Sequence, residues 1–260
     1  MKYVVCLKVT PKVDQIKFDE VKKAVVREGV ENEINDADKN AIEAALLLRD
    51  RYGGSITAMT MGPPSFDTYL KLAIAMGADE AILLSDRNFA GADTYATSRV
   101  LAAALARIKD YDVVLCGEAS SDGSTEQVPA SIAEWLSIPR VTYSLDLSVS
   151  GSNLTAKRSI QGGYEVVEAP MPVLVSIQLG CNAPRFPDFR RKKWAETEYK
   201  SVVWGLADLG LSSNDVGLQG SLTSVEGLRK MTTPVRKAET IGGTPSEIAV
   251  RLLQIIHEST

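Results

Sequence analysis

The first half of the sequence alternates between short apolar runs and longer stretches with helical periodicity. The apolar runs cover residues 3–9, 55–61, 80–85 and 112–117, and each has the length of a strand. Apolar positions recur at a helical period of about 3.6 residues in three stretches between them, residues 38–51, 65–76 and 93–109. Apolar strands that alternate with helices are typical of a parallel sheet covered on both faces. The alternation therefore predicts an α/β fold.

The pattern changes in the second half of the chain. A further helix is expected to start close to Thr125, because Pro129 is tolerated only in a first helical turn. After Pro139, strand-like runs follow one another without helices at residues 140–147, 154–160, 164–169 and 173–179. Gln161, Gly162 and Gly163 have the composition of a hairpin turn. We therefore expect an antiparallel extension added to the parallel sheet.

The composition becomes polar and rich in Gly and Ser from about residue 192. This shift predicts an α/β domain at residues 1–191, which is the candidate nucleotide-binding domain, and a C-terminal arm with a helix at residues 192–260. Thr244, Pro245 and Glu247 fit the N-cap, N1 and capping-box positions of that last helix. Its apolar stripe consists of Ile248, Leu252, Ile255 and Ile256. The stripe is expected to pack either on the chain's own domain or on a partner protein.

Charge and hydropathy exclude several classes of protein. The 29 basic and 33 acidic residues give a net charge of -4, which offers no overall attraction to nucleic acid or an anionic membrane. Apolar residues make up 45% and charged residues 24%, as in ordinary globular proteins. We find no apolar run of about 18 residues and no signal peptide pattern, so we expect a cytoplasmic protein without membrane insertion.

The side chains used most often in catalysis are scarce. Cys6, Cys116 and Cys181 are widely separated, and the only histidine, His257, is expected in the last turn of a helix. A hydrolase triad needs a nucleophile, a base and an orienting group, and a zinc site needs three or four clustered ligands. We therefore predict no catalytic residue and no metal site in this chain, whereas redox chemistry by a bound cofactor remains open.

Three loops are candidates for a ligand site, because ligands bind beyond the carboxyl ends of the strands in open α/β sheets. They span residues 61–64, 86–98 and 117–128. The last loop leads into a helix, whose free N–H groups and dipole favour a phosphate, and Asp122 can accept hydrogen bonds from ribose hydroxyls. An ordinary capped turn would have the same composition, and neither a Walker motif nor GxGxxG is present. The residues thus indicate a nucleotide-binding α/β domain without defining its reaction.

The hairpin region also carries a family resemblance. Basic Lys157 and Arg158, the turn glycines, Glu165 and an apolar strand led by Pro172 closely resemble the signature of electron transfer flavoprotein beta subunits. Gln161 departs from it, since the family usually has an acid there. Further segments resemble the family in matching order at residues 72–79, 182–186 and 217–221. On these matches the chain is identified as a member of this family.

The resemblance implies a fold related to adenine nucleotide alpha hydrolase-like domains and a heterodimer with an alpha subunit that carries FAD. In one branch of the family the beta subunit holds a structural AMP. In the electron-bifurcating branch a second FAD takes that place, accepts hydride from NADH and divides the electron pair between two acceptors. The implied role is an electron carrier between NADH or acyl-CoA-type dehydrogenases and other acceptors, with any NADH oxidation belonging to the complex.

Residues 86–98 and the segment from Asp122 to Val128 resemble the bifurcating branch, whereas the AMP branch usually has asparagine in place of Glu126. Asp93, Thr94 and Thr97 would supply the additional contacts that a larger ligand needs. Residues 119–121, Ser124 and Pro129 depart from the family pattern. Because of the resemblance to the bifurcating branch, FAD is the expected ligand, and AMP is the alternative.

The comparison with the family implies a set of nucleotide contacts. They are Cys6, Asn35, Asp38, Met61, Gly62, Gly117, Asp122, Gly123, Ser124, Thr125, Glu126, Gln127 and Val128. Asn35 and Asp38 also fit a second interpretation, in which their side chains cap a helix.

Two further residues are implied as partner contacts. Glu165 matches a glutamate near the alpha-subunit flavin domain, and Phe189 matches an anchor that inserts into a dehydrogenase. The alternatives are a solvated hairpin charge for Glu165 and, for Phe189 with its basic neighbours, a loop that covers its own core. A stand-alone nucleotide-binding regulator is a third functional class, which would leave the C-terminal arm unexplained.

Overall fold

The computed structural model describes residues 1–12, 17–19, 24–26, 31–224, 238 and 240–258. The chain divides into two compact units, Met1–Gly227 and Leu228–Thr260, which we describe separately.

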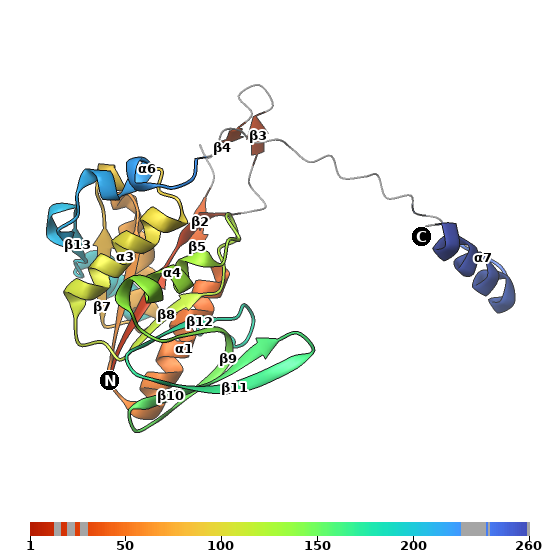
Figure 1. Ribbon diagram of the computed structural model, residues 1–260, viewed down its shortest axis with the longest axis horizontal. Coiled ribbons are helices and arrows are strands. Elements are labelled where there is room, and N and C mark those ends of the chain that lie inside the picture. Colours follow the sequence, from red (N-terminus) through yellow and green to blue (C-terminus); the bar gives the residue numbers. More distant parts are fainter. Residues whose placement is uncertain (13–16, 20–23, 27–30, 225–237, 239, 259–260) are drawn as a thin grey trace. The chain divides into compact units, whose positions relative to one another are not determined.

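A 9-stranded sheet forms the centre of the first unit (Figure 1). Its strands are β1 (Lys2–Leu7), β6 (Ser55–Met61), β7 (Glu80–Leu84), β8 (Val113–Gly117), β9 (Arg140–Ser150), β10 (Asn153–Ile160), β11 (Gly163–Pro170), β12 (Val173–Ile177) and β13 (Val202–Trp204). They lie in the order β11-β10-β9-β12-β8-β1-β6-β7-β13. Pairing is parallel from β9 to β13 along this order, whereas β10 pairs antiparallel with both β9 and β11.

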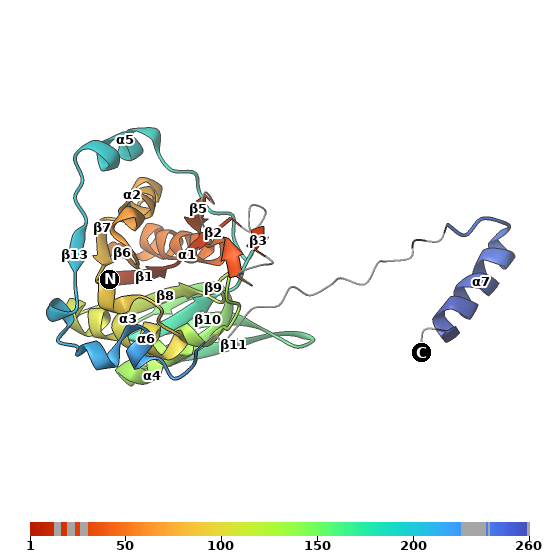
Figure 2. The same cartoon turned by 90° about the horizontal axis from the view of Figure 1, so that it is seen from above.

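Helices cover both faces of the parallel strands, as predicted. α1 (Asp36–Tyr52) and α2 (Asp67–Met76) lie on one face, and α3 (Thr94–Ile108) and α4 (Gln127–Leu136) lie on the other (Figure 2). Successive residues of β1 point to opposite faces, so that Tyr3 and Val5 join the core under α1 and α2 while Val4 joins the core under α3 and α4. Burial on both faces of the sheet explains why the residues of β1 from Tyr3 to Leu7 are all apolar.

Shorter elements connect this framework. They are the ladders β2 (Val9–Pro11) with β5 (Asn32–Ile34) and β3 (Lys17–Asp19) with β4 (Ala24–Val26), the 3-10 turns η2 (Pro64–Phe66), η3 (Arg87–Phe89), η4 (Ala207–Leu209) and η5 (Ser213–Asp215), and the helices α5 (Phe189–Thr197) and α6 (Gly217–Gly220).

The antiparallel extension is confirmed for β10 and β11, which pair through the hairpin at residues 161–162. The run at residues 173–179 was expected in the same extension, and this assignment is wrong. It forms β12, which lies between β8 and β9 and is parallel to both. All five residues of β12 are buried, which is typical of a strand in the interior of a parallel sheet.

The boundary expected after residue 191 falls inside α5. The side chain of Arg191 donates hydrogen bonds to the backbone oxygens of Ile74 and Ala78 in and after α2, at 2.9 and 2.6 Å. Farther along, β13 extends the sheet by pairing with β7. The residues that follow 191 as far as Ser224 thus belong to the first compact unit.

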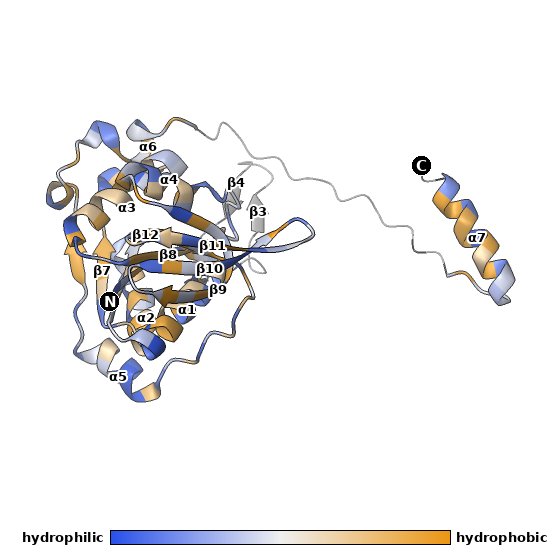
Figure 3. Cartoon of the chain, turned by 60° about the horizontal axis from the view of Figure 1, so that its bottom comes forward, coloured by the Kyte–Doolittle hydropathy of each residue, from blue (hydrophilic) through white to orange (hydrophobic). Residues whose placement is uncertain are grey.

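The second unit contains α7 (Pro245–Glu258), and its start confirms the predicted capping box. Glu247 Oε2 accepts hydrogen bonds from the Thr244 N–H and hydroxyl, both at 2.8 Å, and the Glu247 N–H donates back to Thr244 Oγ1. His257 lies in the last turn, as expected. Figure 3 shows apolar residues along most of α7, and none of its residues is buried. What the stripe packs on remains a prediction.

Among the helices that the structure describes, none combines the length and the hydropathy that a membrane crossing requires.

Candidate functional site

The order of the strands along the sheet reverses at β1, so that the carboxyl ends of β1 and β8 lie next to each other. β6 follows on one side of β1, whereas β8 lies on the other. Ligands of open α/β sheets bind at such a switch point. Lys8 directly follows β1 and Gly117 ends β8, so the residues around these two positions define the candidate site, which we call the crevice.

A buried carboxylate joins the two strand ends. Asp38 Oδ2 accepts a hydrogen bond from the Lys8 N–H at 2.8 Å, and Oδ1 accepts one from the Gly117 N–H at 2.7 Å. Burial raises the pKa of Asp38 to about 6, although these bonds and that of Asn35 act in the opposite direction. Asp38 therefore fixes the backbone at the floor of the crevice.

Asn35 occupies the N-cap position of α1, but its side chain makes no capping hydrogen bond. Instead, its Nδ2 donates to the Ala119 backbone oxygen at 2.8 Å, and its Oδ1 accepts from the Ser121 N–H at 3.1 Å. The capping interpretation is thus wrong for the Asn35 side chain. Asn35 holds the loop that follows β8.

Lys8 reaches across the crevice to the same loop. Its Nζ lies 2.6 Å from Asp122 Oδ1 and 3.1 Å from Ser120 Oγ. Burial acts to raise the pKa of Asp122, but the hydrogen bond and charge of Lys8 outweigh it, so that this pKa lies below its usual value. A half-exposed cation and a carboxylate thus stand together at the predicted site. Asp122 was predicted from the sequence and Lys8 was not, because Lys8 lies inside the strand-like run at residues 3–9 and carries no signal of a ligand contact there.

Two helices begin beside this loop, and they differ in their capping. In α3, Asp93 is the N-cap and its Oδ1 accepts from the Ala96 N–H at 2.9 Å. In α4, the N-cap residue Glu126 makes no side-chain capping bond. The Thr94 hydroxyl at the start of α3 donates to Gln127 Oε1 at 2.8 Å and so connects the two helix ends. The start of α4 therefore retains N–H groups and a dipole end that favour an anion.

Asp93 was expected to contact the ligand, but its carboxylate is already engaged. Oδ2 accepts from the N–H groups of Leu222 and Thr223, both at 2.9 Å, and from the Thr223 hydroxyl at 3.0 Å. The Asp93 N–H donates to Ser221 Oγ at 2.8 Å. Asp93 thus tethers the segment after α6 to the start of α3. Thr97 lies one turn farther along α3 and is partly exposed.

The three glycines predicted at the site have different local explanations. A Cβ on Gly62 would lie 2.1 Å from the Phe66 ring, and a Cβ on Gly117 would lie 2.6 Å from Asp38 Oδ1. Packing within the chain is therefore sufficient to require these two glycines. A Cβ on Gly123 would meet only ordinary contacts, the nearest being Ser120 Oγ at 3.4 Å.

The remaining predicted contacts line or underlie the same edge of the sheet. Met61 ends β6 and is partly exposed, and Ser124 Oγ donates to the Ser120 backbone oxygen at 3.2 Å. Cys6 is buried beside Cys116 in the register of β1 and β8. A hydrogen bond with Cys6, together with burial, raises the pKa of the Cys116 thiol well above its usual value. Thr125 is exposed in the loop, and Val128 follows Gln127 in α4.

The two predicted partner residues lie on other elements. Glu165 Oε1 accepts a hydrogen bond from Arg158 Nη1 at 2.7 Å, across the β10–β11 hairpin. Phe189, the first residue of α5, is 79% exposed. Phe186, which the sequence analysis did not single out as a contact, is 94% exposed. Two large apolar side chains are thus presented to solvent close together in the sequence.

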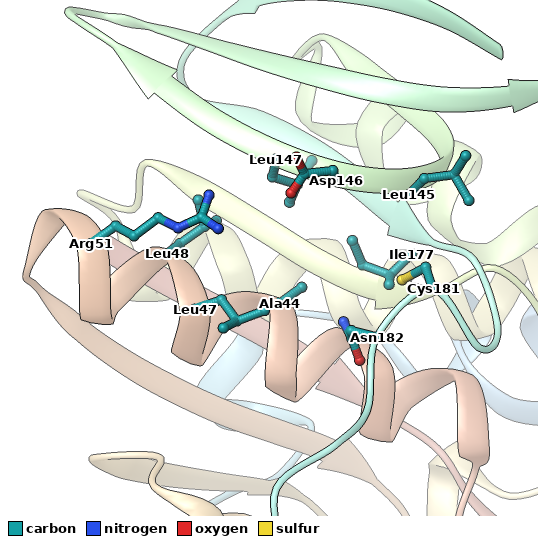
Figure 4. A pocket seen from close by; sticks show the side chains of 10 residues that line it. All are labelled: Ala44, Leu47, Leu48, Arg51, Leu145, Asp146, Leu147, Ile177, Cys181 and Asn182. Carbon is teal, nitrogen blue, oxygen red and sulfur yellow. The ribbon is translucent and has the colours of Figure 1, made fainter.

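Two of the surface hollows lie away from the crevice. One of about 110 Å³ lies between α1 and β9 and is bordered by Arg51, Asp146 and Cys181 (Figure 4). The other, of about 300 Å³, is lined by residues of α2, β7 and β13 and by Tyr199. Neither includes a predicted site residue. Within the described ranges no group of His, Cys, Asp and Glu side chains could hold a metal ion.

Comparisons with known proteins point to one family. Residues 22–202 match the family model of the electron transfer flavoprotein domain. The chain is 39% identical over 254 residues to the electron transfer flavoprotein subunit beta of Thermoanaerobacterium thermosaccharolyticum, covering 98% of this chain and 97% of that protein. It is 43% identical over 226 residues to the protein of the same name from Clostridium acetobutylicum, covering 87% and 86%. It is also 39% identical over 261 residues to the Caffeyl-CoA reductase-Etf complex subunit CarD of Acetobacterium woodii, covering 99% and 98%.

Proposed function

The chain belongs to the family of electron transfer flavoprotein beta subunits, and we propose that it binds FAD in its crevice and works in a bifurcating complex with a FAD-bearing alpha subunit. The observation that carries this proposal is the uncapped start of α4 beside Lys8 and Asp122, at the switch point of the sheet.

The residues of the crevice fit an adenine nucleotide. The N–H groups at the start of α4 and the Lys8 ammonium suit its phosphates, and Asp122 suits ribose hydroxyls because carboxylate oxygens accept hydrogen bonds. Gly123 lets the loop backbone approach the ligand closely. Asn35 and Asp38 act indirectly, since their bonds hold the backbone of the loop and of both strand ends.

FAD, when bound, supplies the capacity to take up an electron pair from NADH and to release the electrons singly to different acceptors. The chain's own residues position it. Thr94 and Gln127, which join the starts of α3 and α4, give the crevice polar groups beyond those that a mononucleotide needs. This additional polar edge favours FAD over AMP.

A dehydrogenase is the partner that we propose for the loop around Phe189. One relative is named as a subunit of a Caffeyl-CoA reductase-Etf complex, which supports a partner of the acyl-CoA dehydrogenase type. Phe186 and Phe189 supply exposed apolar area, and exposed Arg190 and Lys193 surround them with positive charge. Aromatic side chains of this kind are frequent binding hot spots.

The ligand content of the purified complex tests the proposal. The chain is produced together with its alpha subunit, the ligands are released with acid, and FAD and AMP are quantified per complex. The proposal predicts two FAD. One FAD with one AMP would contradict FAD binding in this chain while retaining a nucleotide in the crevice, and a flavin-free monomer would contradict the complex itself.

A further inference from the structure

Tyr143 lies in an irregular part of β9, and its side chain reaches the residue that precedes α4. Its φ is +57°, and the pairing of β9 shifts register against β10 and β12 close to this residue. The Tyr143 N–H donates to the side-chain oxygen of Ser176 in β12, at 3.1 Å, and not to a backbone carbonyl of that strand. Such irregularities bend a strand and redirect a side chain, and they are frequent next to functional sites. The Tyr143 hydroxyl donates a hydrogen bond to Glu126 Oε2.

Glu126, the residue that receives this bond, is also in an unfavourable backbone conformation. It precedes α4 with a φ of +59°, whereas N-cap residues usually have an extended backbone. A left-handed conformation is unfavourable for residues other than glycine. Two non-glycine residues with positive φ are thus joined by one hydrogen bond, and strain of this kind persists where the surrounding structure maintains it.

The conformation of Glu126 has a consequence for the start of α4. A carboxylate at an N-cap accepts hydrogen bonds from the first N–H groups of its helix and is stabilised by the helix dipole. Pro129 lacks an N–H, so Gln127 and Val128 supply the nearest donors. An extended Glu126 would occupy the donors that a phosphate needs.

We infer that Tyr143 is a positioning residue that holds the Glu126 carboxylate away from α4 and so keeps the helix end open for the phosphate of a bound nucleotide. The inference rests on the proposed function. The hydrogen bond to Glu126, followed by burial, raises the pKa of Tyr143, so the phenol stays protonated and able to donate at neutral pH. Glu118 and Arg158 are the other charged groups that act on this phenol.

A single and a double variant test the assignment. Each is studied in the complex with the alpha subunit, after a mild chaotrope has removed the nucleotide from the crevice of this chain. Binding of FAD and, separately, of AMP is measured by calorimetry for the wild type, Tyr143→Phe and Tyr143→Phe with Glu126→Gln. The Phe variant retains the ring but releases Glu126, and we expect at least about fivefold weaker binding. The added Glu126→Gln removes the competing charge and restores affinity to within about twofold of the wild type. Tyr52→Phe, on an exposed residue of α1, is the matched control and leaves the affinity unchanged.

The outcomes separate this assignment from the proposed function. Wild-type complex that binds neither FAD nor AMP overturns the proposed function and the assignment with it. Wild-type complex that binds a nucleotide, combined with an unchanged affinity in Tyr143→Phe, overturns the assignment alone. A loss in Tyr143→Phe that Glu126→Gln fails to restore also overturns it, because the loss would then come from packing and not from the freed carboxylate.

Discussion

Asp38 is a buried carboxylic acid whose titration links the stability of the fold to pH. Its pKa is raised from 3.8 to about 6 in the folded chain, because burial disfavours the charged form. Between these two values the folded state binds more protons than the unfolded state. The free energy of unfolding therefore falls as the pH rises through this window.

Asp38→Asn removes this titration. We expect the wild type to lose about 2 kcal/mol of unfolding free energy relative to the variant between pH 4 and pH 7, since one pKa unit corresponds to about 1.4 kcal/mol and the unfolded chain is already partly ionised at pH 4. Urea unfolding at several pH values measures the difference. Parallel stability curves for the wild type and Asp38→Asn would contradict the raised pKa.

A substitution of Asp122 should affect ligand binding while leaving the stability of the fold nearly unchanged. Asp122→Ala removes a partly exposed ion pair with Lys8, which contributes less than about 1 kcal/mol in such positions. We expect the fold to remain while the complex co-purifies with clearly less adenine nucleotide. Acid release and chromatography quantify the nucleotide. Glu134→Ala, an exposed residue toward the far end of α4, should retain the full content. Unchanged content in Asp122→Ala would remove this residue from the site.

Individual residues of the candidate site could be proposed from the sequence where one segment carries the signal. The loop at residues 117–128 combines small polar residues with a helix start, which indicated Asp122, whereas Gly123 was proposed as a contact only from the family resemblance. Lys8 could not be found in this way, because only the pairing of β1 with β8 brings it within 2.6 Å of Asp122 Oδ1. Tyr143 gave no signal either, since a positive φ at a non-glycine residue in a strand-like run has no sequence pattern.

At the scale of the elements, the junction of β8 with α1 depends on the absence of a side chain at Gly117. Gly117→Ala places a Cβ 2.6 Å from Asp38 Oδ1 and 2.8 Å from the backbone of Ala37. We expect destabilisation of about 1–3 kcal/mol, as for other overpacked interiors. Thermal or urea unfolding measures it. At Gly163 in the hairpin a Cβ would meet nothing within 4 Å, so Gly163→Ala is the matched control with little effect. Equal stability of the two variants would contradict the tight junction.

Long elements with a clear hydrophobic period could be predicted from the sequence, whereas short ones could not. The helices at residues 38–51, 65–76 and 93–109 carry several turns of periodic apolar residues, and α1, α2 and α3 confirm them. The run that forms β12 was placed in the extension, because a short apolar run does not reveal which strand it pairs with. β13 was not predicted, since three residues in a polar region are too few to show a period.

At the scale of the whole molecule, the two compact units have different roles in this account. Among the residues that the structure describes, every buried core residue belongs to the first unit, the last of them being Val216. Deletion of residues 228–260 should therefore leave its unfolding transition unchanged while weakening assembly with the alpha subunit. Calorimetry and analytical gel filtration measure the two effects. A large loss of stability would instead favour the alternative, in which the apolar stripe of α7 packs on the chain's own domain.

A structure of the purified complex, at a resolution that shows bound ligands, will decide whether this chain holds a nucleotide in the crevice. We expect density for an adenine nucleotide, FAD in the preferred form, between the loop after β8, the Lys8 side chain and the starts of α3 and α4. A crevice filled by protein side chains, with the nucleotide bound elsewhere on this chain, would contradict this expectation.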